Sequence, residues 1–147
     1  MRDRFWERHR LCDLSREEWE ALCDGCGKCC LNKLEDADTG KVHLTRVACR
    51  LFDGDSCRCM DYPNRTRHVP ECVVLTPRTV GRHAYWLPET CAYKRLHEGN
   101  DLPGWHPLLT GDPASVHVAG VSAQGWTVPE TEVDEEDWEE MLVEEPT

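Results

Sequence analysis

The sequence predicts a small single domain of the α+β class, built from short helices and strands. Two kinds of apolar pattern recur along the chain, namely helical spacing preceded by capping residues and short runs rich in β-branched residues. Only 39% of the 147 residues are hydrophobic, whereas 31% are charged. All ten cysteines lie between Cys12 and Cys91. Because such a lean apolar content supports only a modest core, we expect the cysteines to help hold the fold together.

Charge and cysteine content divide the chain. Residues 1–95 contain all 17 lysines and arginines against 15 acidic residues, whereas residues 96–147 contain 13 acidic residues and no Lys or Arg. We expect an N-terminal extension over 1–14, a cysteine-cluster domain over 15–128 and an acidic tail over 129–147. The net charge of −11 disfavours nucleic acid as a partner, because phosphates repel an acidic protein.

The first predicted element is a short helix over residues 16–22. Ser15 and Glu18 form the capping-box pattern at its start, and Trp19 and Leu22 follow at helical spacing. This helix leads directly into the densest group of cysteines. Trp19 and Leu22 are therefore expected to be core residues near that group.

Strand patterns follow the cysteine loop. Alternation over 41–44 predicts a strand, the apolar run over 47–52 predicts a second, and the β-branched stretch over 72–75 predicts a third, short one. Polar turns with Asp and Gly separate the first two from their neighbours.

The rest of the chain is predicted to mix helices and irregular structure. A Thr-Pro start predicts one or two helical turns over 76–81, and a second helix is expected over 90–98, where Gly99 ends it. Prolines make 102–109 a packed loop. The segment 116–128 has strand-like residues interrupted by glycine, and apolar residues at helical spacing predict a short amphipathic helix in the acidic tail.

The cysteine loop is the most informative stretch. Cys23, Cys26 and Cys29 recur at intervals of three, and the glycines between them allow a tight loop that turns three sulfurs toward one centre. Cys30 is expected to point away from Cys29, because neighbouring side chains of an extended chain point to opposite sides. It would then serve a second centre or the core.

Metal binding is the chemistry that this pattern favours. The N-terminal residues lack the apolar run of an export signal, and no window resembles a membrane span, so we expect a cytoplasmic protein. In a reducing cytosol, clustered thiols are more often metal ligands or redox groups than disulfides. Three thiolates in seven residues also require a cation or protonation, because a folded interior does not tolerate their charge.

The spacing does not identify the metal. A bacterial ferredoxin run would place its fourth cysteine at position 33, which is Lys33, so the fourth ligand must come from elsewhere in the chain. Cys57 and Cys59 are expected to share one face of an extended segment. Thiolates suit both zinc and iron–sulfur clusters, and the compact triplet favours iron–sulfur narrowly. Cys12 stands apart as a bystander. The expected metal ligands are Cys23, Cys26, Cys29, Cys30, Cys49, Cys57, Cys59, Cys72 and Cys91.

The motifs together resemble a known family. The loop matches the signature of the CxxCxxCC zinc- or iron-chelating domain, the YkgJ-type cysteine-cluster family, and four downstream blocks resemble its bacterial YcgN subgroup over about residues 15–145. The resemblance implies a small bacterial protein of the cytoplasm whose nine cysteines from Cys23 to Cys91 belong to the shared pattern, and it implies no particular activity. The downstream blocks are Val47–Arg50, Cys57–Cys59, Trp86–Tyr93 and Leu102–Gly111.

The predicted function is that of a cysteine-cluster metalloprotein with a role in redox chemistry or metal handling. Two alternatives remain: a zinc-scaffolded module that binds an unknown protein partner, and a metal-dependent enzyme of unknown substrate. The enzyme would use a metal with an open position near His106 as a Lewis acid. A hydrogen-bonded packing role for His106 is the simpler interpretation.

Overall fold

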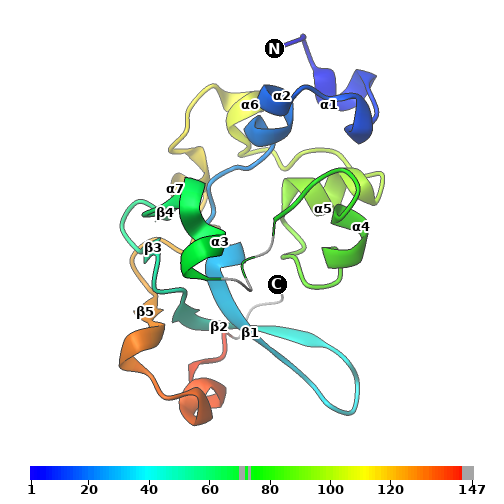
Figure 1. Cartoon of the computed structure of the whole chain (residues 1–147). Coiled ribbons are helices and arrows are strands. Elements are labelled where there is room, and N and C mark those ends of the chain that lie inside the picture. The colour runs from blue at the N-terminus through cyan, green and yellow to red at the C-terminus, as the bar shows by residue number, and fades with distance from the viewer. Residues whose placement is uncertain (70–71, 73, 144–147) are drawn as a thin grey trace. The chain divides into compact units, whose positions relative to one another are not determined.

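The computed structural model describes residues 1–69, 72 and 74–143 (Figure 1). The chain forms two compact units, of which the first comprises Met1–Gly25 and Val74–Val121 and the second Cys26–Val73 and Ser122–Thr147. Within the described residues, the elements of the first unit are all helical and every strand belongs to the second. The predicted α+β class is confirmed. The predicted boundaries at residues 14 and 128 stay a prediction.

The first unit is an assembly of short helices. Its core contains Phe5, Trp19, Leu22 and Tyr93, and the rings of Trp19 and Tyr93 lie 4.7 Å apart between centroids. The Tyr93 hydroxyl donates to the Trp19 carbonyl at 2.7 Å, and the Trp19 indole donates to the Leu75 carbonyl at 3.1 Å. The buried polar atoms of Trp19 and Tyr93 are thus satisfied. The elements are α1 (Phe5–Arg8), η1 (Leu11–Asp13), α2 (Arg16–Ala21), α4 (Val80–His83), α5 (Ala92–His97), α6 (Pro107–Thr110) and α7 (Ser115–Val118), where η denotes a 3₁₀ helix.

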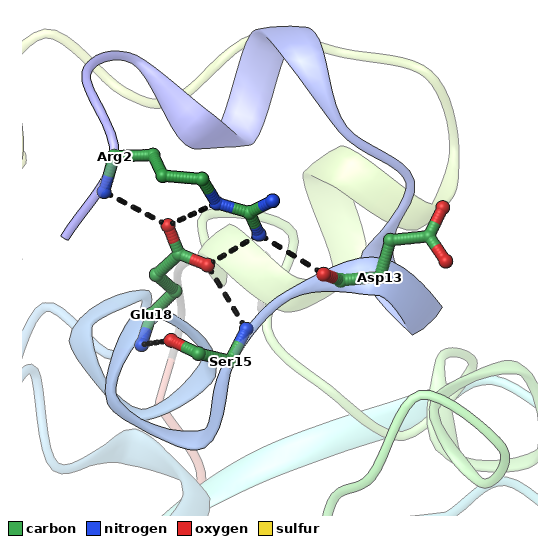
Figure 2. A network of polar contacts seen from close by, with 4 residues as sticks. All are labelled: Arg2, Asp13, Ser15 and Glu18. Atoms are coloured by element: carbon green, nitrogen blue, oxygen red, sulfur yellow. Dashed lines mark hydrogen bonds and ion pairs between the residues drawn. The ribbon is translucent and has the colours of Figure 1, made fainter.

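Helix α2 begins where the capping box predicts. The Glu18 amide donates to Ser15 Oγ at 3.1 Å, and the Ser15 amide donates to Glu18 Oε1 at 2.9 Å. Figure 2 shows that Arg2 closes this network, because its guanidinium and backbone amide also donate to the Glu18 carboxylate. The side chain of Glu18 is 1% exposed. The bonds from Arg2 and from the Ser15 amide hold the pKa of Glu18 well below its ordinary value.

The second unit is built on a small mixed sheet. Strands β1 and β2 are antiparallel neighbours, and β5 joins the other edge of β2 in parallel. A separate antiparallel pair is formed by β3 and β4. The elements are η2 (Lys28–Cys30), β1 (Leu31–Glu35), β2 (Val42–Ala48), β3 (Phe52–Asp53), β4 (Arg58–Cys59), η3 (Tyr62–Asn64), α3 (Arg65–His68), β5 (Val128–Pro129), η4 (Glu130–Glu132) and η5 (Glu135–Met141).

The β1–β2 hairpin contains an irregularity close to the cysteine loop. Leu31 pairs with Ala48 and Lys33 with Leu44, so the register shifts at Asn32. The Thr45 hydroxyl donates to the Asn32 carbonyl at 2.7 Å and thereby satisfies it. Such a bulge bends the strand end that carries the cysteines.

Several expected elements differ from the structure. The strands expected over 41–44 and 47–52 are mainly one strand, β2, which ends at Ala48. The segment 116–128 contributes helix α7 and the short strand β5, because its valines are separated by residues that turn the chain. The loop over 102–109 ends in the single-turn helix α6, and the tail helix is the 3₁₀ helix η5. The strand expected over 72–75 includes Val73, which lies outside the described residues.

Candidate metal centre

The open end of the β1–β2 hairpin places two cysteines opposite each other. The Leu31–Ala48 pair is the last in the ladder, and the next hydrogen bond runs from the Cys49 amide to the Cys30 carbonyl at 2.8 Å. Cys30 and Cys49 are separated by a long hairpin in the sequence, so it is strand pairing that brings them together.

The β3–β4 pair adds a third cysteine. The Phe52 amide donates to the Cys49 carbonyl at 2.8 Å, so β3 begins one turn after the end of β2. Phe52 pairs with Cys59 on β4. Because Phe52 contacts Cys49 on one side and pairs with Cys59 on the other, the β3–β4 pair brings Cys59 close to Cys49.

Five thiols of the second unit interact electrostatically. Cys30 interacts with Cys29, Cys49 and Cys59, and Cys72 interacts with Cys29, Cys49 and Cys59. We call this group the five-thiol cluster; its members are Cys29, Cys30, Cys49, Cys59 and Cys72.

The environment of the cluster favours protonated thiols in the metal-free protein. A hydrogen bond with Cys29, followed by burial, raises the pKa of Cys30 far above its ordinary value. Burial is the main cause that raises the pKa of Cys49 and of Cys72. A negative charge on one thiol also disfavours a charge on its neighbours. A bound cation would reverse both effects.

The donor set fits a soft metal by its chemistry, since thiolate sulfur suits zinc and iron–sulfur clusters. In the described part of the chain, no three His, Cys, Asp or Glu side chains are close enough together to hold one metal ion. The five thiols therefore interact with one another but are not arranged as the complete ligand set of one metal ion.

Cys29 and Cys30 do not point to opposite sides, contrary to the expectation for an extended chain. Both residues belong to the 3₁₀ helix η2, and their side chains are hydrogen-bonded to each other. Cys29 is exposed and Cys30 is half-buried. The tight helical turn places both thiols in one cluster.

Cys57 lies apart from the five-thiol cluster. Its φ of 60° is in the left-handed region, so the segment is not extended. The expectation that Cys57 and Cys59 share one face of an extended segment is therefore not met. The Cys57 thiol is buried in the core of the second unit and interacts with the Ser122 hydroxyl and the Ala123 amide. Burial raises its pKa, and these two hydrogen bonds partly oppose the rise.

The cysteine loop packs closely on β3 at Gly27. This residue has φ +77°, and a Cβ placed there would lie 2.7 Å from the Phe52 ring and 3.1 Å from Cys57 Cβ. The Cys26 carbonyl accepts a hydrogen bond from the Ala123 amide at 2.8 Å. Only glycine fits this combination of a left-handed conformation and a close contact.

The remaining expected ligands lie elsewhere. Cys23 and Cys91 belong to the first unit, and Cys26 to the second. Cys23 is exposed, whereas Cys91 is half-buried at the N-cap of α5 and packs against the core of its unit. Cys12 is exposed in η1.

His106 has both ring nitrogens occupied. It is fully buried; Nε2 lies 2.7 Å from the Leu22 carbonyl and Nδ1 accepts from the Leu108 amide at 3.1 Å. This arrangement matches the packing interpretation of His106. The enzyme alternative gains no support from it, because neither nitrogen is available to a metal or substrate.

The fold and the site define a small α+β protein that gathers cysteine thiols at the ends of short strands. The CxxCxxCC signature, described as a "Putative zinc- or iron-chelating domain", matches residues 22–92. The chain belongs to the UPF0260 family.

Relatives from several bacteria match along nearly the whole chain. A UPF0260 protein of Rhodobacter capsulatus is 57% identical over 144 residues, which cover 98% of this chain and 96% of that protein. The UPF0260 proteins of Ectopseudomonas mendocina and Azotobacter vinelandii are 55% and 56% identical over 139 residues, covering 95% of this chain and 93% of each relative. No solved structure matches this chain.

The family description agrees with the expectation that the metal is zinc or iron, without distinguishing the two. Among the described residues, none of the helices has the length and apolar character needed to cross a membrane.

Proposed function

We propose that this chain is a metalloprotein of the cytoplasm that binds its metal through cysteine thiolates, with the five-thiol cluster as the principal site. The observation that supports this proposal is the electrostatic interaction among five thiols of the second unit, three of which, Cys30, Cys49 and Cys59, lie at the ends of β1, β2 and β4. Membership of a family described as zinc- or iron-chelating supports it independently.

Charge explains why these thiols would take up a cation. The thiols of Cys30, Cys49 and Cys72 are disfavoured as thiolates by burial and by one another. A cation that accepts their sulfur lone pairs removes both penalties, so metal binding would displace protons and stabilise the fold. Half-buried thiols at strand ends with no such partner would contribute little beyond small apolar contacts.

The other cysteines complete the proposed ligand set. Cys23 and Cys26 share a loop with Cys29, and Cys57 and Cys91 bring the number of thiols to nine. Nine thiolates suffice for two four-ligand centres with one to spare. We propose that the chain holds more than one metal, and that its role is in redox chemistry or metal handling.

The compact spacing of the cysteine loop favours an iron–sulfur centre narrowly over zinc. Anaerobic purification, elemental analysis and visible absorption test this preference. Iron with acid-labile sulfide and a brown colour would support the cluster, and stoichiometric zinc in a colourless protein would support a zinc scaffold. A natively folded protein that contains neither metal and binds neither in solution would contradict the proposal.

Variants then test the ligand assignment. Cys49→Ser removes a member of the five-thiol cluster, and Cys12→Ser removes an exposed cysteine outside the expected ligand set. We expect Cys49→Ser to lower the metal content and Cys12→Ser to leave it unchanged. Equal metal content in both variants would show that Cys49 is not a ligand.

A further inference from the structure

The residues on both sides of Cys23 are held by one loop of the first unit. Leu22 ends the helix that leads into the cysteine loop, and its carbonyl lies 2.7 Å from Nε2 of His106. Leu22 and His106 are both fully buried. This contact joins positions 84 residues apart in the sequence.

The hydrogen bonds define how His106 acts. Nδ1 accepts from the Leu108 amide at 3.1 Å, which makes the His106 side chain the N-cap of α6. The ring proton of the neutral imidazole is therefore on Nε2, which donates to the Leu22 carbonyl. The single imidazole ring thus caps α6 with one nitrogen and fixes the end of α2 with the other.

Trp105 makes the matching contact on the other side. Its indole Nε1 donates to Asp24 Oδ2 at 3.1 Å, and Asp24 is 7% exposed. Leu22 and Asp24 are the immediate neighbours of Cys23, and Trp105 and His106 are consecutive. Cys23 itself is exposed. Trp105 and His106 therefore hold both neighbours of an exposed cysteine, Asp24 through its carboxylate and Leu22 through its carbonyl.

We infer that Trp105 and His106 are positioning residues for Cys23. This inference rests on the proposed function, in which Cys23 is a metal ligand. Fixing Leu22 and Asp24 before metal arrives lowers the conformational entropy that Cys23 loses when it coordinates. Residues that orient ligands in this way typically contribute about 10–100-fold to metal affinity.

Two substitutions test the inference with the fold otherwise kept. His106→Asn keeps a short acceptor for the Leu108 amide but is too short to reach the Leu22 carbonyl. Trp105→Phe keeps a large ring but loses the donor to Asp24. The matched control is Trp19→Phe, which loses an indole hydrogen bond of the same length, 3.1 Å, to the Leu75 carbonyl rather than to a neighbour of Cys23. His106→Gln restores a donor with the reach of Nε2.

The measurement is the rate at which the Zn²⁺-loaded full chain releases zinc to a chromogenic chelator under reducing conditions. We expect His106→Asn and Trp105→Phe to release zinc about tenfold faster than the wild type. Trp19→Phe should stay within about twofold, and His106→Gln should release zinc more slowly than His106→Asn. In a Cys23→Ser background, His106→Asn should have no further effect, because the ligand that it positions is gone.

The outcomes separate the two proposals. If Cys23→Ser releases zinc at the wild-type rate, the assignment of Cys23 as a ligand fails and the positioning role fails with it. If Cys23→Ser releases zinc quickly but both loop variants behave like Trp19→Phe, only the positioning role is overturned. An equal effect of His106→Asn with and without Cys23 would likewise overturn it, since the histidine would then act through general stability.

Discussion

Replacement of Gly27 by alanine is the sharpest test of how the cysteine loop is held on the second unit. Gly27 has φ +77°, and an added Cβ would lie 2.7 Å from two carbons of the Phe52 ring. Phe52 is 8% exposed in the core with Leu31 and Cys57, so its ring cannot retreat without disturbing that packing.

The expected cost has two parts. A left-handed backbone conformation costs an alanine about 1–2 kcal/mol relative to glycine. Overpacking a core site adds about 1–3 kcal/mol. We therefore expect Gly27→Ala to lower the free energy of unfolding by about 2–5 kcal/mol.

Gly25→Ala is the matched control in the same loop. Gly25 has φ +82°, but a Cβ there meets no heavy atom within 4 Å. Its expected cost is the backbone part alone, about 1–2 kcal/mol. Urea unfolding of both variants, reduced and at equal metal load, measures the difference. Equal destabilisation by the two substitutions would refute the close packing of Gly27 on Phe52.

Three further predictions concern the α2 network and the thiols. Ser15→Ala should lower the free energy of unfolding by about 1 kcal/mol, because the Glu18 amide loses its cap; an unchanged urea midpoint would contradict this. Hydrogen bonds from Arg2 and Ser15 lower the pKa of Glu18 from its ordinary value of 4.5 in the folded state. These bonds therefore stabilise the folded protein above pH 4.5, and their contribution is lost as the pH falls below 4.5. Thermal unfolding between pH 3 and 7 should show that loss in the wild type and a shallower one in Glu18→Gln, whereas identical slopes would refute the assignment. Iodoacetamide followed by mass spectrometry of the reduced, metal-free protein should modify exposed Cys12 much faster than Cys57, which is 6% exposed, and the reverse order would contradict the burial of Cys57.

Local sequence signals identified the start of α2 correctly. Ser15 and Glu18 make their reciprocal bonds within one helical turn, so the information lies in four consecutive residues. The end of α5 before Gly99 is local in the same way, since Gly99 takes φ +84°.

Features that depend on distant partners were missed. Strand β1 has only five residues and forms because it pairs with β2, and its own sequence carries no clear alternation. Val116 and Val118 suggested a strand, yet Val116 is buried as part of helix α7. Tertiary packing overrides β-propensity in such short segments.

The cysteines likewise show local features that the sequence predicts and long-range features that it does not. The loop spacing predicts a common metal-binding role for Cys23, Cys26 and Cys29, whereas only the structure shows which thiols interact with one another. The left-handed conformation of Cys57 has no signal in the sequence, because non-glycine residues rarely adopt it. The prolines predict a packed loop that includes His106. The contact of His106 with Leu22 could not be predicted, since the two residues are far apart in the chain.

The ratio of metal to protein in anaerobically purified Cys30→Ser, compared with Cys12→Ser, shows whether the five-thiol cluster binds the metal. Cys30 interacts with three other thiols of the five-thiol cluster, whereas Cys12 lies outside it. Loss of at least one metal equivalent from Cys30→Ser, with full metal content in Cys12→Ser, is the predicted result. Full zinc or iron content in both variants would contradict the account.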